Sequence, residues 1–268
     1  MCRSWVNQAS ITKEQLAPLE IPLPSLDEQQ RIAAILDKAD DLRRKRRRAI
    51  ELLDGLTQVL FLEMFGDPIL NARGYRTRRL IDLVERDRGI SYGIVQRGDD
   101  QEVGVKVLRI FDFEDGVVID TNIKKTTAEI ASRFRRTSLK GGEIVISIRG
   151  TVGRCASIPA SLSGANVSRE VAVIPTLEPN KNAFYLSVLR TDAAQRRLSS
   201  DVKGIAQRGI NLEDLRELPI IQPPKEELAK FDAAQERLAA VVSGSQSQNC
   251  HLDSLFSSLQ SRAFSGQL

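Results

Sequence analysis

The sequence has few of the residues that build metal centres, and it has no long apolar run. Its 268 residues include three cysteines, Cys2, Cys155 and Cys250, and one histidine, His251. The cysteines are far apart and form no CxxC pair, so we expect no structural zinc site. No run of about 18 apolar residues exists, and no apolar segment follows Met1, so we expect neither a membrane span nor a signal peptide. The expected setting is a reducing cytoplasm.

Motifs of common catalytic sites are also missing. The chain contains no histidine-centred triad, no nuclease PD…(D/E)xK pattern and no Asn/Asp-Pro-Pro-Tyr/Phe motif of amino-methyltransferases. The glycine-rich turn at 150–153 is no P-loop, because the Gly-Lys-Ser/Thr ending is absent. Two carboxylates, Asp112 and Glu114, could hold a magnesium ion, but their segment is more typical of a strand leading into a turn. We therefore expect no catalytic residue and no metal site.

The charge of the chain is modest, but arginine is abundant. The formal net charge is +4, which by itself indicates nucleic acid only weakly. Arginine forks match phosphate oxygens and guanine edges better than lysine does. The densest basic run, residues 43–48, could contact DNA phosphates or a partner subunit. A solvated helix face is the simpler interpretation of that run.

A long internal repeat organises the sequence. Residues 8–66 reappear at residues 207–265 with a constant offset of 199 and no gap. Residues 53–54 and 252–253, for example, are both Leu-Asp. Solenoid repeats run to roughly 20–50 residues, so this period is too long for a solenoid. The repeat predicts a duplicated structural frame that brackets a single insert of different character.

Each copy of the repeat predicts a long helix with an apolar seam. In the first copy Ser25 is a suitable N-cap, Glu28 completes a capping box, and the helix should run to about Leu62. Apolar residues recur at alternating steps of three and four, which is the heptad pattern. The seams comprise Ile32, Ile35, Ala39, Leu42, Leu53, Leu56 and Leu60, and then Phe231, Ala234, Leu238, Val241, Leu252, Leu255 and Leu259. The pattern favours a coiled coil, although each helix could instead cover its own globular core.

The insert has the pattern of a β-rich domain. Short strand candidates separated by Gly, Pro and Asn occur at 103–110, 117–120, 143–148, 154–158 and 169–174, and residues 182–199 predict one helix. We therefore predict an α+β fold, with one β-rich domain inserted between two long coiled-coil-forming helices. The expected divisions are residues 1–66, 67–221 and 222–268.

These features converge on one family. The chain resembles the specificity subunit of type I restriction-modification systems. The resemblance rests on the lead into the first helix at 19–29, the Met-Phe-Gly-Asp-Pro exit at 64–68, and four stretches of the insert. Of those four stretches, 139–153 and 164–169 look like a target recognition domain, and 204–207 with 210–215 look like its exit. The motifs follow in order and span nearly the whole chain.

The resemblance implies a DNA-binding role without catalysis or a cofactor in this chain. Each recognition domain would read half of a bipartite double-stranded DNA site, and the helices would set the distance between the halves. Modification subunits would bind S-adenosylmethionine and methylate adenine, and a restriction subunit would join for cleavage. Residues 1–20 look like the tail of a preceding recognition domain, so we expect a half-length form. Two copies could then form a homodimer that reads an inverted repeat, and a monomer with intramolecularly paired helices is the alternative.

Two sets of functional residues follow from this interpretation. Arginines flank the turn at 148–154, where glycine allows close approach of a ligand, although an ordinary tight turn would explain that pattern equally well. The expected DNA contacts are Arg135, Arg136, Arg149, Thr151, Arg154, Asn166 and Arg169. The expected partner or dimer interface comprises Leu53, Leu56, Leu60, Leu252, Leu255 and Leu259. A nuclease using Asp112 and Glu114, and a coiled-coil interaction protein without DNA function, are the competing hypotheses.

Overall fold

The computed structural model describes residues 3–5, 8–10, 12–13, 17–18, 23–114, 116–120, 122–199 and 209–265, and it describes no side chains at 3–5, 8–10, 46–47, 49–54, 242–252 and 264. The chain forms two compact units. Met1–Leu52 and Val241–Leu268 make up the first, called here the helix unit. Leu53–Ala240 make up the second, called the β unit. No helix among the described residues is long and apolar enough to cross a membrane.

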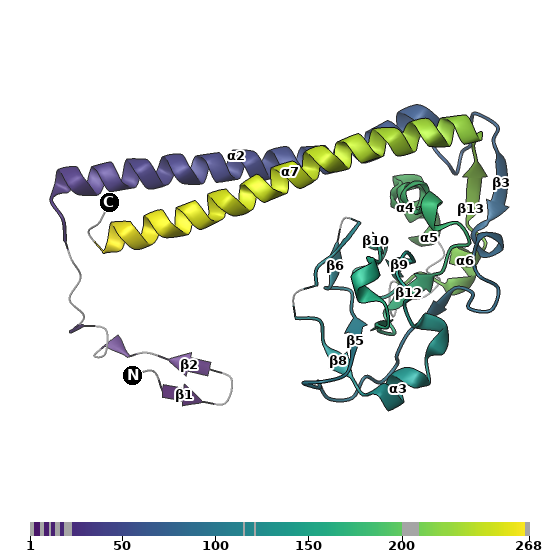
Figure 1. Cartoon of the computed structure of the whole chain (residues 1–268), viewed down its shortest axis with the longest axis horizontal. Helices are drawn as coiled ribbons and strands as arrows, with labels where there is room; N and C mark the ends of the chain where they lie inside the picture. The colour runs from purple at the N-terminus through teal and green to yellow at the C-terminus, as the bar shows by residue number, and fades with distance from the viewer. Residues whose placement is uncertain are drawn as a thin grey trace. The chain divides into compact units, whose positions relative to one another are not determined.

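The helix unit combines one end of each long helix. Helix α2 spans Leu26–Phe65 and helix α7 spans Lys225–Phe264. The predicted N-cap of α2 is confirmed, because the Ser25 hydroxyl accepts a hydrogen bond from the Glu28 backbone N–H at 3.4 Å. A short hairpin, β1 (Arg3–Trp5) and β2 (Gln8–Ser10), precedes α2 in the chain (Figure 1).

Contacts between the two helices in this unit are polar as well as apolar. The Arg43 guanidinium donates to the Asp253 carboxylate, with an Nε–Oδ1 distance of 2.7 Å, and lies 4.3 Å from the centre of the Phe256 ring. Leu42 and Leu255, which the heptad pattern placed in the seam, are 50% and 53% exposed. Arg43, the residue after Leu42, is the side chain of α2 that contacts Asp253 and Phe256 of α7. Leu53 and Leu252 lie outside the described side chains.

The β unit is built on a four-stranded antiparallel sheet with strand order β10-β9-β12-β4. Its two central strands carry only buried residues, Ile-Val-Ile-Ser and Val-Ala-Val-Ile, because both faces of the sheet are covered. The strands of the unit are β3 (Arg76–Arg79), β4 (Ser91–Tyr92), β5 (Val105–Leu108), β6 (Phe113–Glu114), β7 (Val117–Val118), β8 (Lys125–Thr126), β9 (Ile144–Ser147), β10 (Cys155–Ser157), β11 (Asn166–Val167), β12 (Val171–Ile174) and β13 (Pro219–Gln222). A second sheet has the order β11-β5-β8, and β13 pairs with β3.

Helices and short 3-10 turns close the unit. They are η1 (Leu80–Leu83), α3 (Ala128–Ser132), η2 (Arg135–Thr137), η3 (Ala160–Leu162), η4 (Pro179–Lys181), α4 (Asn182–Arg190), α5 (Asp192–Ser199) and α6 (Leu212–Arg216). The predicted α+β organisation, a β-rich region between two long helices, is confirmed. Each of the five predicted strand segments contains a strand.

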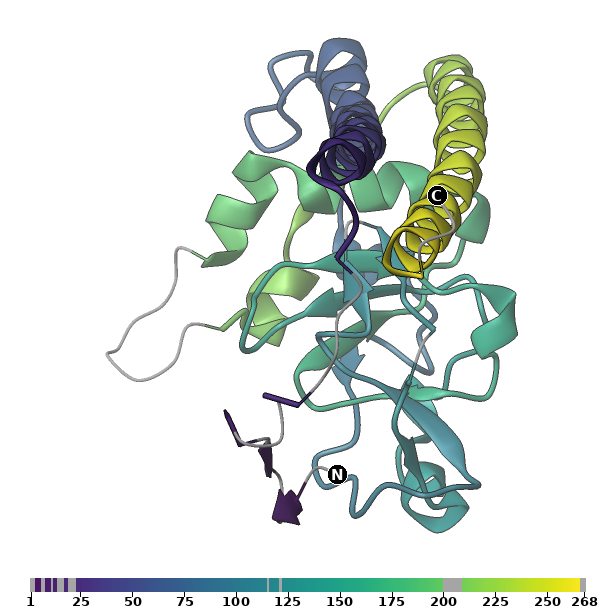
Figure 2. The same ribbon diagram turned by 90° about the vertical axis from the view of Figure 1, so that its left-hand side faces the viewer.

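An aromatic cluster joins the ends of both long helices to the sheet. Phe61 and Phe65 of α2, Phe184 of α4 and Phe231 of α7 are each at most 2% exposed. Phe65 lies 5.2 Å from Phe184 and 5.3 Å from Phe231, measured between ring centroids. Helix α4 thus forms a layer between the helix ends and the strands (Figures 1 and 2). The β unit includes residues 53–66 and 222–240 because these ends belong to its core.

The prediction of a single helix over 182–199 is wrong. Helix α4 ends at Arg190, and Thr191 has extended backbone angles, φ −63° and ψ 142°. The Thr191 hydroxyl donates to the Val188 carbonyl at 2.8 Å and accepts from the Ala194 N–H at 3.2 Å. Threonine therefore caps a new helix, α5, because its short polar side chain competes for the backbone groups of the turn.

Candidate nucleic-acid interface

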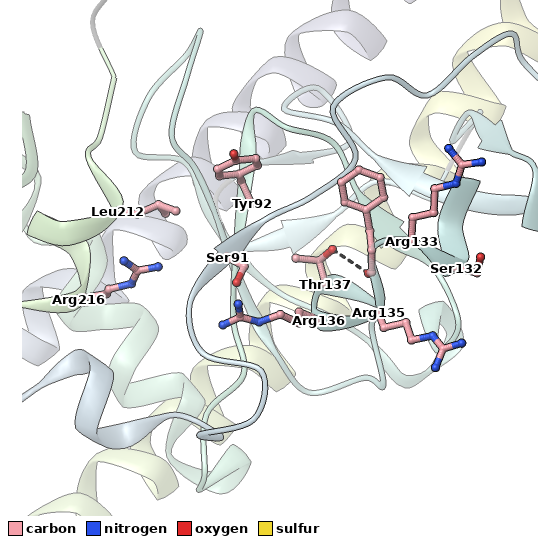
Figure 3. Close-up of a pocket in the computed structure, with 10 residues that line it drawn as sticks. Ser91, Tyr92, Ser132, Arg133, Arg135, Arg136, Thr137, Leu212 and Arg216 are labelled. Carbon is pink, nitrogen blue, oxygen red and sulfur yellow. Dashed lines mark hydrogen bonds between the residues drawn. The ribbon is translucent and has the colours of Figure 1, made fainter. Parts of the chain in front are cut away.

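Four arginines line a pocket of about 470 Å³ on the β unit. Arg133 follows the last residue of α3, Arg135 and Arg136 belong to η2, and Arg216 comes from the end of α6. Tyr92 of β4 lies over the pocket. Figure 3 shows Arg136 and Arg216 reaching toward the pocket from opposite sides, whereas Arg133 and Arg135 point outward. The pocket therefore combines several cations with two aromatic residues, Tyr92 and Phe134.

The pairing of these arginines differs. Arg133 forms an ion pair with Glu129, and Arg216 forms one with Glu213 at 3.2 Å. The Arg136 guanidinium donates to a backbone carbonyl, that of Arg88, at 2.8 Å. Among the residues that the structure describes, neither Arg135 nor Arg136 has a carboxylate within ion-pair distance. Their charges are thus available to an anionic ligand.

Asn166 supports the backbone of the arginine segment, residues 133–138, from the buried side. Its side chain is 1% exposed. Its amide nitrogen donates to the Phe134 carbonyl at 3.0 Å, and its amide oxygen accepts from the Thr137 hydroxyl and the Val167 N–H, both at 2.8 Å. A buried amide with three such partners organises backbone. It lies where it cannot reach a ligand at the surface, unlike the direct contact expected from the sequence.

The turn at 149–153 forms a second arginine-bearing feature. Arg149 is exposed, has no carboxylate partner among the described residues, and its backbone pairs with Gly209. Thr151 is exposed, and its carbonyl accepts from the Ser147 hydroxyl at 2.6 Å. Gly150 and Gly153 have φ values of +72° and +90°, and a Cβ at Gly153 would lie 1.9 Å from the Gln195 amide oxygen. Both glycines are therefore required by the backbone and its packing, whether or not a ligand binds.

Two further predicted contacts are occupied by carboxylates. Arg154 lies 2.8 Å from Glu114, and Arg169 lies 3.1 Å from Glu170. Burial raises the pKa of Glu170, but the nearby Ser168 hydroxyl, the Arg169 guanidinium and the residue's own backbone outweigh burial and lower the pKa below its usual value. Such partly exposed pairs contribute only about 0–1 kcal/mol. A DNA phosphate could replace either carboxylate at little cost.

The structure thus separates the seven residues expected at the DNA. Arg135 and Arg136 line the pocket, Asn166 supports them, Arg149 and Thr151 lie on the turn, and Arg154 and Arg169 are ion-paired. Sequence reasoning missed Tyr92 and Arg216. A single tyrosine in a two-residue strand carries no pattern, and Arg216 reaches the pocket only through the folding of α6.

The carboxylates of the nuclease hypothesis have other roles. Asp112 is 4% exposed, and its two oxygens accept from the Arg109 guanidinium and backbone N–H at 2.7–3.1 Å. Glu114 is the partner of Arg154. Asp112 stabilises the turn between β5 and β6, and Glu114 links β6 to the residue that precedes β10. Within the described part of the chain, no cluster of three or more His, Cys, Asp or Glu residues could hold a metal ion.

The chain belongs to the type I restriction modification DNA specificity domain family, whose model matches residues 4–52 and 77–244. It is similar to the specificity subunit of the type I restriction enzyme EcoBI of Escherichia coli, with 25% identity over 98% of this chain and 62% of that protein. The MjaIX specificity subunit of Methanocaldococcus jannaschii is 23% identical over 94% of this chain and 61% of that protein. The chain therefore spans about three fifths of the length of these relatives.

Two solved structures share the fold. One chain, reported under "Structural basis underlying complex assembly and conformational transition of the type I R-M system", superposes with a TM-score of 0.57 at 23% identity, covering 98% of this chain and 65% of that one. The type I restriction-modification S subunit from M. genitalium gives a TM-score of 0.55 at 18% identity, covering 96% and 66%. At these identities the likeness is one of fold.

Proposed function

We propose that this chain is a DNA specificity subunit of a type I restriction-modification system, with the β unit as its target recognition domain. Family membership supports the class of function. The observation that carries the site is the pocket, where Arg135 and Arg136 are exposed beside Tyr92 and have no carboxylate partner in the part of the chain that the structure describes. The chain reads DNA and carries no catalysis.

Recognition uses two kinds of contact. Arginines that meet phosphates position the domain and carry no sequence information, whereas an arginine bidentate to a guanine edge discriminates by about 1–3 kcal/mol. Arg135, Arg136 and Arg149 are the exposed candidates for either role. Arg154 and Arg169 join them when DNA displaces Glu114 and Glu170. The Tyr92 ring offers an apolar contact to a sugar or base.

Catalysis belongs to partner proteins. Modification subunits bind S-adenosylmethionine and methylate adenine, and a restriction subunit joins the complex for cleavage. The two long helices pair as a coiled coil in the helix unit and hold recognition domains apart. The half-exposed leucines of the helix unit, Leu42 and Leu255, provide apolar area for a partner, and Leu56 of the β unit is half exposed as well.

A homodimer would complete the recognition of a two-part site. Two copies related by a two-fold axis form a self-complementary interface and place two identical β units on DNA. The site read would then be an inverted repeat. Light scattering over a range of concentrations tests this arrangement. A constant mass near 29.8 kDa, alone and with DNA, contradicts the dimer and the inverted repeat together.

The DNA-binding role is tested by mobility shift of the full chain, alone and with a modification subunit. The Arg135→Ala/Arg136→Ala variant should weaken binding at least several-fold. Arg79→Ala is the matched control, because Arg79 is an exposed arginine of β3 paired with Asp82 and Glu217, outside the pocket lining. Methylome sequencing of cells with and without the gene would then identify the motif. Methyl transfer from labelled S-adenosylmethionine by the isolated chain would contradict the non-catalytic role.

A further inference from the structure

A buried ion pair lies directly behind the arginine segment. The side chains of Arg88 and Glu143 are 8% and 4% exposed, and Arg88 Nη1 lies 2.7 Å from Glu143 Oε1. The Glu143 carboxylate also accepts from the backbone N–H groups of Lys140 and Gly141 at 2.8 and 2.9 Å. Desolvation offsets much of the attraction in such pairs, so replacing both partners by apolar residues is often neutral for stability. The pair is therefore more informative about the positions of the groups bonded to it than about the stability of the fold.

Arg88 binds the arginine segment with its remaining donors. Its Nη2 donates to the Ser138 carbonyl at 2.8 Å, and its Nε donates to the Arg136 carbonyl at 3.2 Å. Arg136 reciprocates, because its own Nε donates to the Arg88 carbonyl at 2.8 Å. Gly89 leaves room for this arrangement, since a Cβ there would lie 3.0 Å from Arg136 Nη2. The backbone at 88–89 and the segment 136–138 are thus held to each other in both directions.

Residues 88–90, which lead into β4, also hold the opposite side of the pocket. Arg216 Nη2 donates to the Ile90 carbonyl at 3.0 Å. Arg136 and Arg216 are therefore tied to carbonyls only two residues apart, those of Arg88 and Ile90. Residues 91–92 continue as β4 and pair with the buried strand β12. Figure 3 shows the two guanidinium groups on opposite sides of the pocket.

We propose that Arg88 and Glu143 are a positioning pair for DNA recognition, fixing the separation of Arg136 and Arg216 and the orientation of the segment that carries Arg135. The inference rests on the DNA-binding function proposed above. Both side chains are buried, so they act through the pocket arginines and do not touch DNA. Recognition of base edges depends on such fixed separations, because discrimination is lost when a binding group is held loosely. Phosphate attraction depends on them much less.

The experiment compares selected with random DNA. The full chain, alone and with a modification subunit, is measured for binding to random-sequence duplexes and to the duplex that wild type selects from that pool. Arg88→Lys keeps the charge opposite Glu143 but lacks the planar fork that reaches three acceptors. Arg88→Met/Glu143→Leu removes both charges, so no buried charge is left unpaired. Arg79→Lys is the control for an arginine replacement elsewhere on the β unit.

In both Arg88 variants we expect the ratio of the affinity for selected DNA to the affinity for random DNA to fall about tenfold, while the affinity for random DNA changes little. Arg79→Lys should keep the wild-type ratio. Circular dichroism and thermal unfolding identify the variants that remain folded, and Arg88→Lys serves if the double variant does not fold. A folded Arg88 variant with the wild-type ratio would overturn the proposal. If the Arg135→Ala/Arg136→Ala variant bound DNA as tightly as wild type, the proposed DNA interface would be wrong. The two experiments therefore distinguish failure of the positioning pair from failure of the interface.

Discussion

The two ends of the same long helices are held in different ways. In the β unit, Phe61, Phe65 and Phe231 pack with Phe184, and all are almost fully buried. In the helix unit, α2 and α7 meet through the Arg43–Asp253 ion pair and the Phe256 ring, and Leu42 is half exposed. The aromatic end is part of a globular core, whereas the other end is a two-helix contact in which the described side chains bury little apolar surface. Truncating side chains at the two ends should therefore lower the free energy of unfolding by very different amounts.

The largest expected difference is between Phe65→Ala and Leu42→Ala. Phe65 is 1% exposed and packs with four aromatic rings, so its removal should lower the free energy of unfolding by about 3–5 kcal/mol. Leu42 is half exposed, and its removal should cost less than about 1 kcal/mol. Urea unfolding followed by circular dichroism measures both. Equal costs would show that the two ends are packed alike.

Capping residues provide a smaller version of the same comparison. Thr191 is 1% exposed and caps α5 inside the β unit, whereas Ser25 caps α2 in the helix unit and is exposed. We expect Thr191→Ala to cost about 1–2 kcal/mol and Ser25→Ala about 0.5 kcal/mol, because water replaces the lost bond only at Ser25. Thr191→Ser, which keeps the hydroxyl, is the control. A Ser25 effect as large as that of Thr191 would contradict the argument from burial.

The β unit should also lose stability at alkaline pH through Cys155. Burial raises the pKa of this thiol from 9.0 to about 12, against a smaller opposing effect of Arg190. A raised folded pKa contributes stability below pH 9, and that contribution is lost as pH rises from 9 toward 12, because the unfolded thiol ionises first. We expect a loss of about 1 kcal/mol near pH 10 relative to Cys155→Ala. The same pH profile in both proteins would show that the thiol is accessible to water in the folded state.

The smallest effect should come from the polar contact of the helix unit. A double-mutant cycle on Arg43→Ala and Asp253→Ala should give a coupling free energy of about 0.5–1 kcal/mol, since both side chains are partly exposed. Salt should reduce it. Arg44→Ala, which removes an ion pair within α2 only, is the matched control. A coupling of several kcal/mol would indicate that the helix unit depends on this pair as strongly as the β unit depends on its aromatic cluster.

Local sequence was sufficient for much of the fold. The Ser25 cap, the repeat of residues 8–66 and the apolar runs at 143–148 and 169–174 predicted the long helices and the central strands, because caps and periodicity act over a few residues. The break at Thr191 was missed, since the apolar pattern continues through it. Strand β3 was missed as well, because its Arg-Thr-Arg-Arg sequence has no apolar face and becomes a strand only by pairing with β13.

The sequence by itself determined the class of fold, the duplicated frame and the richness of the insert in arginine. Only the tertiary structure decided which arginines are free, because the carboxylates that pair with them are set by the fold. Glu114 reaches Arg154 from 40 positions away, whereas Arg135 meets no carboxylate among the described residues. The roles of Arg88 and Asn166 were decided in the same way, since a buried polar group takes its function from the partners that folding brings to it.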